Sequence, residues 1–282
     1  MKRNTLTIEL GRKLKQAIFI LAGLFAIPAC VMAQALPATP PSGYDQGGRY
    51  PSGSVSDVNY YSSVAGKELT MKVYTPPNYD PNQKYGVVYC YQGIRADTGT
   101  IFADWCVGTG IVCDNLIGEG KISKGVIIVA VDDQFNGDYS DVNGMTLNDA
   151  IPFVDSNYPT YADADHRGVY GYSWGGGYAF NVGCGNLNTF HHIAPSSAAP
   201  SKAGDDSLFP NGGAEAKAKL KTLVISCGNA DWLGLYSKSD DSHNYCVSNG
   251  IPHAWWPVNG GDHNGGVWRP HMWNFLQMAD AA

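Results

Sequence analysis

Short apolar segments alternate with segments of helical length along most of this chain, and this alternation restricts the possible folds more than any other feature of the sequence. The apolar segments are hydrophobic at both odd and even positions, which is typical of strands buried on both faces. They cover residues 68–74, 86–91, 125–131, 168–172, 191–194, 222–227 and 253–258. The helical segments cover residues 104–119, 146–157, 173–183, 213–220, 232–248 and 268–281. This pattern predicts an α/β fold with a mainly parallel sheet covered by helices on both faces, and functional residues at the carboxyl ends of the strands.

The first 33 residues have the pattern of a secretory signal peptide. Basic residues precede an uncharged apolar run over residues 17–29, and small residues up to Ala33 provide a cleavage site. The run is shorter than the roughly 20 residues that span a bilayer, which disfavours a transmembrane anchor. Cys30 leaves lipid anchoring as an alternative, which Pro28 two positions earlier disfavours. We therefore expect a secreted or periplasmic protein.

Removal of residues 1–33 would leave 14 basic and 24 acidic residues, a net charge of −10. This charge disfavours nucleic acid and anionic membranes as partners. Residues 34–57 are rich in Pro, Gly and Ser and lack periodicity, so we predict an extended leader there. The remaining residues 58–282 suit one large domain.

Six cysteines follow the predicted signal peptide, and their spacing forms no metal-binding pattern. Cys90 and Cys227 lie within apolar strand-like runs, which favours buried thiols. Cys106 and Cys113 are close enough in sequence to pair if their segment bends, and export would permit a disulfide. The sequence leaves the state of this pair open.

The segment Gly171-Tyr172-Ser173-Trp174-Gly175 follows a short predicted strand directly and precedes a helical stretch. A G-x-S-x-G motif in this setting is typical of a nucleophilic serine, because glycines on either side of the serine allow the sharp turn from strand to helix. The serine hydroxyl then lies at a helix N-terminus, which stabilises a developing oxyanion. The alternative is that Ser173 caps the helix and the glycines only allow close packing.

A serine nucleophile needs a base, and His263 is our candidate. It lies in a glycine-rich loop, residues 259–266, between the last predicted strand and the last predicted helix. The other downstream histidines fall within or beside strands, or within helices, where a structural role is expected: His191, His192, His243, His253 and His271.

The base in turn needs a carboxylate that holds its tautomer and stabilises its charge. Asp231 follows the predicted strand at 222–227 after a short turn, which is where this third group is expected in the chain order serine, acid, histidine. Asp262, Asp240 and Asp241 are the alternatives. Asp262 adjoins the histidine in sequence, and neighbours in an extended loop tend to point apart.

We assign the oxyanion donors to two backbone N–H groups. One belongs to Trp174, the residue after the serine, and the other to a loop after an early strand. The strand at 86–91 runs into Gln92-Gly93-Ile94, so the second donor is assigned to Ile94.

With these residues in place, the chain from about Gly43 onward resembles carbohydrate esterase family 1, and most closely the feruloyl esterase modules of bacterial cellulosomal xylanases. The motifs that carry the resemblance are DNLIGEGKI at 114–122, DSNYPTYADADHR at 155–167, GGGYAFNVG at 175–183, SSAAP at 196–200 and VWRPHMWNFLQMAD at 267–280. The resemblance implies the α/β-hydrolase fold and no metal or organic cofactor. It also implies Ser173 as nucleophile, Asp231 as acid and His263 as base.

The chain departs from the family pattern at two places. Gln92-Gly93 stands where the family usually has His-Gly, and Arg95-Ala96-Asp97 replaces a glycine-rich stretch. Trp174 stands where the serine turn usually has Met. The departure at Gln92-Gly93 affects the assignment of the second oxyanion donor. The departure at Trp174 affects the shape of the acyl pocket.

The resemblance predicts release of ferulate from arabinoxylan by acyl transfer, with feruloylated or acetylated xylan and its oligosaccharides as substrates. Acetylxylan esterase activity is the alternative within the family, since Trp174 would suit a smaller acyl pocket. An alternative of another class is a non-catalytic carbohydrate-binding protein, which the intact set of serine, aspartate and histidine disfavours.

Overall fold

A computed structural model describes residues 39–123, 125–132, 139–199 and 204–281 of the 282-residue chain. The predicted signal peptide, with Cys30, lies outside these residues. Within the described ranges, no helix has both the length and the hydrophobicity needed to cross a membrane.

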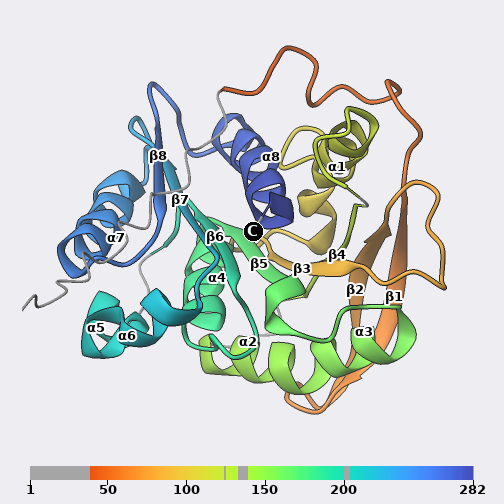
Figure 1. The fold of residues 1–282 in the computed structure, drawn as a ribbon, viewed down its shortest axis with the longest axis horizontal. Coiled ribbons are helices and arrows are strands. Elements are labelled where there is room, and N and C mark those ends of the chain that lie inside the picture. The colour runs from red at the N-terminus through yellow and green to blue at the C-terminus, as the bar shows by residue number, and fades with distance from the viewer. Residues whose placement is uncertain (1–38, 124, 133–138, 200–203, 282) are drawn as a thin grey trace, which may run out of the picture. The chain divides into compact units, whose positions relative to one another are not determined.

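One sheet of eight strands forms the centre of the domain, in the order β1-β2-β4-β3-β5-β6-β7-β8 (Figure 1). The pairs β1–β2 and β2–β4 are antiparallel, and every other pair is parallel. The strands are β1 (Ser54–Ser62), β2 (Lys67–Thr75), β3 (Gly86–Tyr91), β4 (Val126–Ala130), β5 (Arg167–Tyr172), β6 (His192–Ser196), β7 (Thr222–Gly228) and β8 (Ala254–Val258). The predicted fold class, a mainly parallel α/β-hydrolase sheet, is confirmed.

Helices cover both faces of this sheet. They are η1 (Thr98–Ile101), α1 (Thr109–Gly118), α2 (Tyr139–Met145), η2 (Thr146–Ala150), α3 (Ile151–Asn157), η3 (Ala164–His166), α4 (Trp174–Cys184), α5 (Gly204–Leu208), α6 (Pro210–Lys219), α7 (Leu235–Asn249) and α8 (Gly265–Ala281). Two buried apolar layers result. One lies between the sheet and α1 and α8, and the other between the sheet and α2, α3, α4 and α7 (Figure 1).

The central strands are apolar throughout because each serves both layers. Along β3, Val87, Tyr89 and Tyr91 belong to the α4 layer, whereas Val88 and Cys90 belong to the α8 layer. Side chains alternate between the faces of a strand, so a strand buried on both faces is hydrophobic at every position. This is why continuous apolar runs mark the central strands β3 to β7; all seven predicted strands are present in the structure.

Strand β1 was not predicted from the sequence, and unlike the central strands it is not buried on both faces. It forms the edge of the sheet and pairs only with β2. Its burial alternates toward its end, with Tyr60 buried and Tyr61 exposed, and six of its nine residues are exposed. An antiparallel edge strand with one face in water carries few apolar residues. Strand β1 therefore contains no continuous apolar run that would predict it, and the fold begins at Ser54 rather than at the predicted Val58.

The prediction of an extended leader is wrong for residues 39–53, which the structure describes. Residues 39–53 contain turns but no helix or strand. They are nevertheless docked onto α1, where the buried Asn115 donates to the carbonyl oxygen of Tyr44 at 2.8 Å. Asp114 accepts the backbone N–H of Gly53, also at 2.8 Å. Tertiary hydrogen bonds to the backbone need no periodic sequence, so composition did not reveal this docking.

The helix boundaries differ from the prediction on one face of the sheet. The predicted helix at 146–157 is the second part of a longer helical stretch, in which α2 leads through a π-helical turn, Thr146–Ala150, into α3. Helix α5 was not predicted. Predicted helices at 173–183 and 268–281 correspond to α4 and α8 within a few residues.

All six cysteines of the described chain are buried, and the structure shows no bond between Cys106 and Cys113. The possible pairing of Cys106 with Cys113 is therefore not present. Cys113 lies within α1, whereas Cys106 lies in the preceding loop, and burial raises the pKa of Cys113 to about 12. The predicted burial of Cys90 and Cys227 is confirmed, with both side chains inaccessible to solvent.

Candidate active site

Three side chains from distant parts of the chain meet above the carboxyl ends of the parallel strands. Ser173 follows β5, Asp231 follows β7 and His263 follows β8. The Ser173 Oγ lies 2.9 Å from the His263 Nε2, and the His263 Nδ1 lies 2.7 Å from the Asp231 Oδ2. An ionised carboxylate only accepts hydrogen bonds, so Nδ1 carries the proton and Nε2 is left to accept the serine hydroxyl. This arrangement lets the imidazole withdraw the serine proton.

The backbone of Ser173 has an unusual conformation, with φ 57° and ψ −121° directly before α4. A residue other than glycine that adopts this backbone conformation destabilises the fold by on the order of 1–3 kcal/mol, so it persists only where the surrounding structure holds it. Here the Ser173 N–H donates to the Ser196 carbonyl at 3.0 Å, and the Ser173 carbonyl accepts the Ala199 N–H at 2.8 Å. The loop after β6 therefore holds the strained turn from both sides.

The two flanking glycines of the motif are required by close backbone contacts. A Cβ added to Gly171 would lie 2.0 Å from the carbonyl oxygen of Gly175. A Cβ added to Gly175 would lie 2.3 Å from the carbonyl oxygen of Tyr91. Both distances are far below van der Waals contact, and the neighbours are backbone atoms that cannot move aside. The glycines thus allow β3, β5 and α4 to converge at the serine.

Asp231 is held as a buried carboxylate. Its side chain is fully shielded from solvent, and the His263 side chain is 8% exposed. The Asp231 Oδ1 accepts the backbone N–H of Leu233 at 3.0 Å, so one oxygen is oriented by the turn while the other faces the imidazole. The Cys227 Sγ lies 3.7 Å from the Asp231 Oδ2, the oxygen that faces the imidazole.

The alternative acids do not contact the imidazole in this way. Asp262 accepts two backbone N–H groups through its Oδ1, that of Trp232 at 3.2 Å and that of His263 at 2.7 Å. It therefore connects the loop after β7 with the loop after β8. Asp240 and Asp241 lie on α7, where Asp240 accepts from an amide one turn away.

The other histidines have partners elsewhere. The His192 Nε2 pairs with the Asp165 carbonyl at 2.8 Å, and the His271 Nε2 pairs with the Val224 carbonyl at 3.0 Å. Burial lowers the pKa of His192 to about 4 and that of His271 to about 3. His243 and His253 form a pair with 2.8 Å between their nitrogens, and His191 pairs with the Asp165 carboxylate.

The structure brings the predicted oxyanion loop beside the nucleophile. A Cβ added to Gly93 would lie 3.4 Å from the Ser173 Cβ, and Ile94 follows in a turn closed by a 3.0 Å hydrogen bond from the Ala96 N–H to the Gly93 carbonyl. Trp174 is the first residue of α4. The two backbone donors assigned from the sequence thus lie in the two segments next to the serine.

Trp268 is a neighbour of the site that sequence reasoning missed. Its ring lies edge-on to that of His263, with 5.1 Å between ring centroids, and stacks on Tyr172 at 4.3 Å. Its indole N–H donates to the Ser197 Oγ at 3.3 Å. Trp268 therefore supports the imidazole from one side. The available signal was its place one helical turn into α8, five residues after the histidine.

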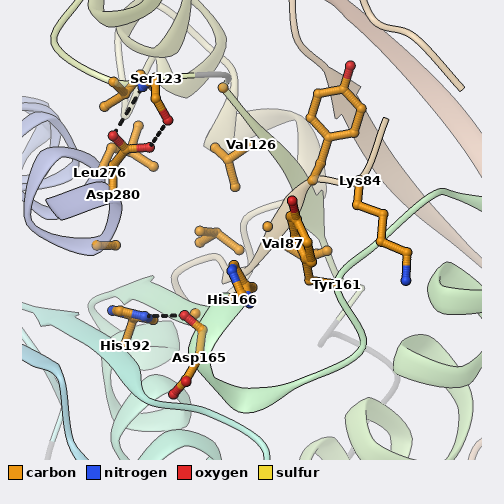
Figure 2. A pocket seen from close by; sticks show the side chains of 17 residues that line it. Lys84, Val87, Ser123, Val126, Tyr161, Asp165, His166, His192, Leu276 and Asp280 are labelled. Carbon is orange, nitrogen blue, oxygen red and sulfur yellow. Dashed lines mark hydrogen bonds between the residues drawn. The ribbon is translucent and has the colours of Figure 1, made fainter. Parts of the chain in front are cut away.

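A separate cavity lies at the opposite edge of the sheet, shown in Figure 2. It measures about 250 Å³ and is lined by residues at the amino ends of β3, β4, β5 and β6, together with His166 and the end of α8 at Asp280. Ser173, Asp231 and His263 are not among its lining residues. Because functional groups of parallel sheets gather at the carboxyl edge, this cavity is distinct from the candidate site.

No cluster of three or more metal-ligating side chains suited to an ion is found among the described residues.

Residues 62–277 match the model of the Esterase family, described as "Putative esterase". The chain belongs to this esterase family. Two curated relatives share part of this esterase's sequence. "Endo-1,4-beta-xylanase Y" of Acetivibrio thermocellus is 31% identical over 129 residues, 41% of the chain and 12% of the relative. "Endo-1,4-beta-xylanase/feruloyl esterase" of Xylanibacter ruminicola is 28% identical over 139 residues, 44% of the chain and 19% of the relative. The esterase thus spans well under a quarter of either relative.

A solved structure shares the fold of this esterase. It is a CE1 ferulic acid esterase from Anaeromyces mucronatus in complex with ferulic acid, with a TM-score of 0.77 and 20% identity. The alignment covers 88% of the chain and 99% of that structure. The resemblance to carbohydrate esterase family 1 predicted from the motifs is confirmed.

Proposed function

We propose that this protein is an exported serine esterase that releases ferulate from arabinoxylan through an acyl-enzyme intermediate. The observation that carries the proposal is the continuous hydrogen-bonded chain from Ser173 through His263 to Asp231. A buried carboxylate, an oriented imidazole and a hydroxyl at a helix N-terminus are the groups that acyl transfer needs.

In the first half of the reaction, His263 takes the proton of Ser173 as the Oγ attacks the ester carbonyl. The Asp231 carboxylate, 2.7 Å from Nδ1, stabilises the resulting imidazolium. The negative charge on the former carbonyl oxygen is stabilised by the backbone N–H groups assigned to Trp174 and Ile94. The ester bond then breaks, and His263 gives its proton to the departing sugar hydroxyl.

In the second half, water replaces the sugar. His263 withdraws a proton from the water, whose oxygen attacks the acyl-serine carbonyl, and the same backbone donors stabilise the second oxyanion. Collapse of this intermediate releases the carboxylic acid, and the proton returns to the Ser173 Oγ. The net reaction consumes the ester and one water, and the side chains return to their starting protonation states.

The choice of ferulate rests on the relatives. One curated relative is named an endoxylanase and feruloyl esterase, and the fold neighbour was solved with ferulic acid.

The predicted signal peptide over residues 1–33 supports action outside the cytoplasm. Sequencing of the exported protein is expected to give an N-terminus just after Ala33, and an uncut N-terminus would contradict export by this signal.

The activity is tested with three substrates: methyl ferulate, feruloylated arabinoxylan and acetylated xylan. We expect the full-length protein to release ferulate with a kcat/KM at least about 100-fold above that for acetate. Ser173→Ala is expected to lower kcat by about 10³-fold or more. Preferential release of acetate would overturn the substrate assignment in favour of acetylxylan.

Covalent labelling separates an enzyme from a non-catalytic binding protein. An organophosphate is expected to modify Ser173 in the parent protein, and the His263→Ala variant is expected to react far more slowly because the hydroxyl loses its base. Failure of the parent protein to react, with polysaccharide binding retained, would overturn the esterase proposal.

A further inference from the structure

Two tryptophan residues whose segments contact the loop between β8 and α8 have side chains that face water. Trp105 is 74% exposed and Trp232 is 72% exposed, the largest fractions among the large hydrophobic side chains of the described chain. Burying an aromatic side chain of this size stabilises it by roughly 1.5–3 kcal/mol, so exposed indoles favour a binding partner. We call these two residues the tryptophan pair.

Trp232 is attached directly to the candidate catalytic groups. It follows Asp231 in sequence, and its backbone N–H donates to Asp262 at 3.2 Å. Its ring meets that of His263 edge-on, with 6.3 Å between centroids and 87° between planes. The exposed indole therefore has a defined place next to the imidazole.

Trp105 is attached to the other end of the loop between β8 and α8. A Cβ added to Gly265, the first residue of α8, would lie 2.9 Å from the Trp105 carbonyl oxygen and 2.3 Å from that of Cys106. Arg269 of the same helix donates to the carbonyl oxygens of Asp104 and Cys106. The backbone that carries the Trp105 indole is thus fixed against the start of α8.

The charges beside the two indoles restrict what can bind there. Asp104 precedes Trp105, and Asp262 lies against the Trp232 backbone. The predicted mature chain has a net charge of −10. The guanidinium of Arg269 near Trp105 is paired with Asp45, so the carboxylates at both positions disfavour acidic polysaccharides and anionic surfaces. The apolar faces of uncharged sugar rings stack on an indole without opposing this charge.

We propose that the tryptophan pair binds the uncharged sugar backbone of the polysaccharide on either side of the ester. This inference rests on the proposed function, because it takes the polysaccharide as the carrier of the acyl group. The two residues contact opposite ends of the loop that carries His263, at Gly265 and at Asp262, so a sugar chain bound at both would cross this loop and bring its acyl substituents toward Ser173. Remote contacts of this kind position the substrate for reaction.

Kinetics on a large and a small substrate test the proposal. For Trp105→Ala and Trp232→Ala, the ratio of kcat/KM on feruloylated arabinoxylan oligosaccharides to kcat/KM on methyl ferulate is expected to fall about tenfold. The Trp→Tyr variants, which retain an aromatic face, should recover most of the ratio. Tyr61→Ala serves as the matched control, since Tyr61 is an aromatic side chain 65% exposed on the edge strand β1. An unchanged ratio in both tryptophan variants would overturn the proposal.

A binding measurement keeps the test independent of catalysis. Affinity electrophoresis of Ser173→Ala in gels containing arabinoxylan stripped of its esters is expected to show retardation. Adding Trp105→Ala or Trp232→Ala should abolish it, and polygalacturonate should cause none. Absence of retardation by arabinoxylan, or equal retardation by polygalacturonate, would reject the proposed ligand while leaving ester hydrolysis to be judged separately. A dimer in light scattering that either variant dissociates would assign the surface to self-association instead.

Discussion

At the scale of single residues, the candidate site depends on side chains that orient others. His263 is placed by Asp231 at one ring nitrogen, by Trp268 at the ring edge and by Asp262 at its backbone N–H. Reaction geometry is sensitive to displacements of about 1 Å, which cost on the order of 100-fold in rate. We therefore expect substitutions in these supporting groups to act on kcat.

Asp262→Ala tests the carboxylate that connects the two loops. Its loss leaves the backbone N–H groups of Trp232 and His263 without their acceptor. We expect kcat to fall by about tenfold or more with little change in KM. The Asp262→Asn variant retains an accepting oxygen and is expected to restore most of kcat. Wild-type kcat in the alanine variant would show that the connection has no positioning role.

Gly175→Ala tests the convergence of backbones at the serine. The new Cβ would lie 2.3 Å and 2.4 Å from the carbonyl oxygens of Tyr91 and Gln92. We expect a loss of more than about 3 kcal/mol of stability or no folded protein at all. Gly47→Ala is the control, since its Cβ would meet only Ile111 at an ordinary 3.5 Å. Urea unfolding compares the two, and equal stabilities would contradict the contact argument.

At the scale of elements, the segment before β1 belongs to the domain through its contacts with α1. Asn115 donates to the carbonyl oxygens of Tyr44 and Gln46 at 2.8 and 3.1 Å, and it is 2% exposed. Asp45 pairs with Arg269 of α8. These contacts tie an irregular segment to two helices of the same sheet face.

Asn115→Ala is expected to loosen this docking. Two backbone carbonyls would lose their donor, which destabilises by about 1–3 kcal/mol. We expect a lower midpoint of urea unfolding and faster hydrogen exchange within residues 39–53. Asn82→Ala is the matched control, because the Asn82 amide makes its hydrogen bond in an exposed turn. Unchanged exchange in 39–53 would contradict the anchoring role of Asn115.

At the scale of the whole molecule, two buried neutral histidines make stability depend on pH. The pKa of His192 is lowered to about 4 and that of His271 to about 3, both by burial. In the unfolded chain a histidine titrates near 6.5. Between these values the unfolded chain binds more protons than the folded protein, so acid favours unfolding. The stabilisation is complete above about pH 6.5 and is lost as the pH falls toward the folded values.

We therefore expect the free energy of unfolding to fall by about 4 kcal/mol between pH 7 and pH 5. Urea unfolding at the two pH values measures this difference. His192→Gln should reduce this pH dependence by about half, because the unfolded chain then binds one additional proton, at His271, instead of two. A stability that is equal at both pH values would show that these histidines do not stay neutral in the folded protein.

The domain as a whole also shows how far the sequence alone predicts the molecule. The central buried strands and the turn at Ser173 were predicted because their causes are local, namely continuous apolar runs and paired glycines. Asp231 and His263 were selected from the loops that follow strands. Strand β1 was missed because its polar face is in water, and the docking of residues 39–53 was missed because it has no periodic signal.

By itself, the sequence determined the α/β architecture, the esterase family and the three candidate residues, since periodicity and short motifs are properties of neighbouring positions. Only the tertiary structure decided that Ser173 and His263 lie 2.9 Å apart, that Asp262 connects two loops and that Cys106 and Cys113 are not bonded to each other. Such contacts join residues that the sheet brings together from distant parts of the chain, and no pattern of adjacent residues records them.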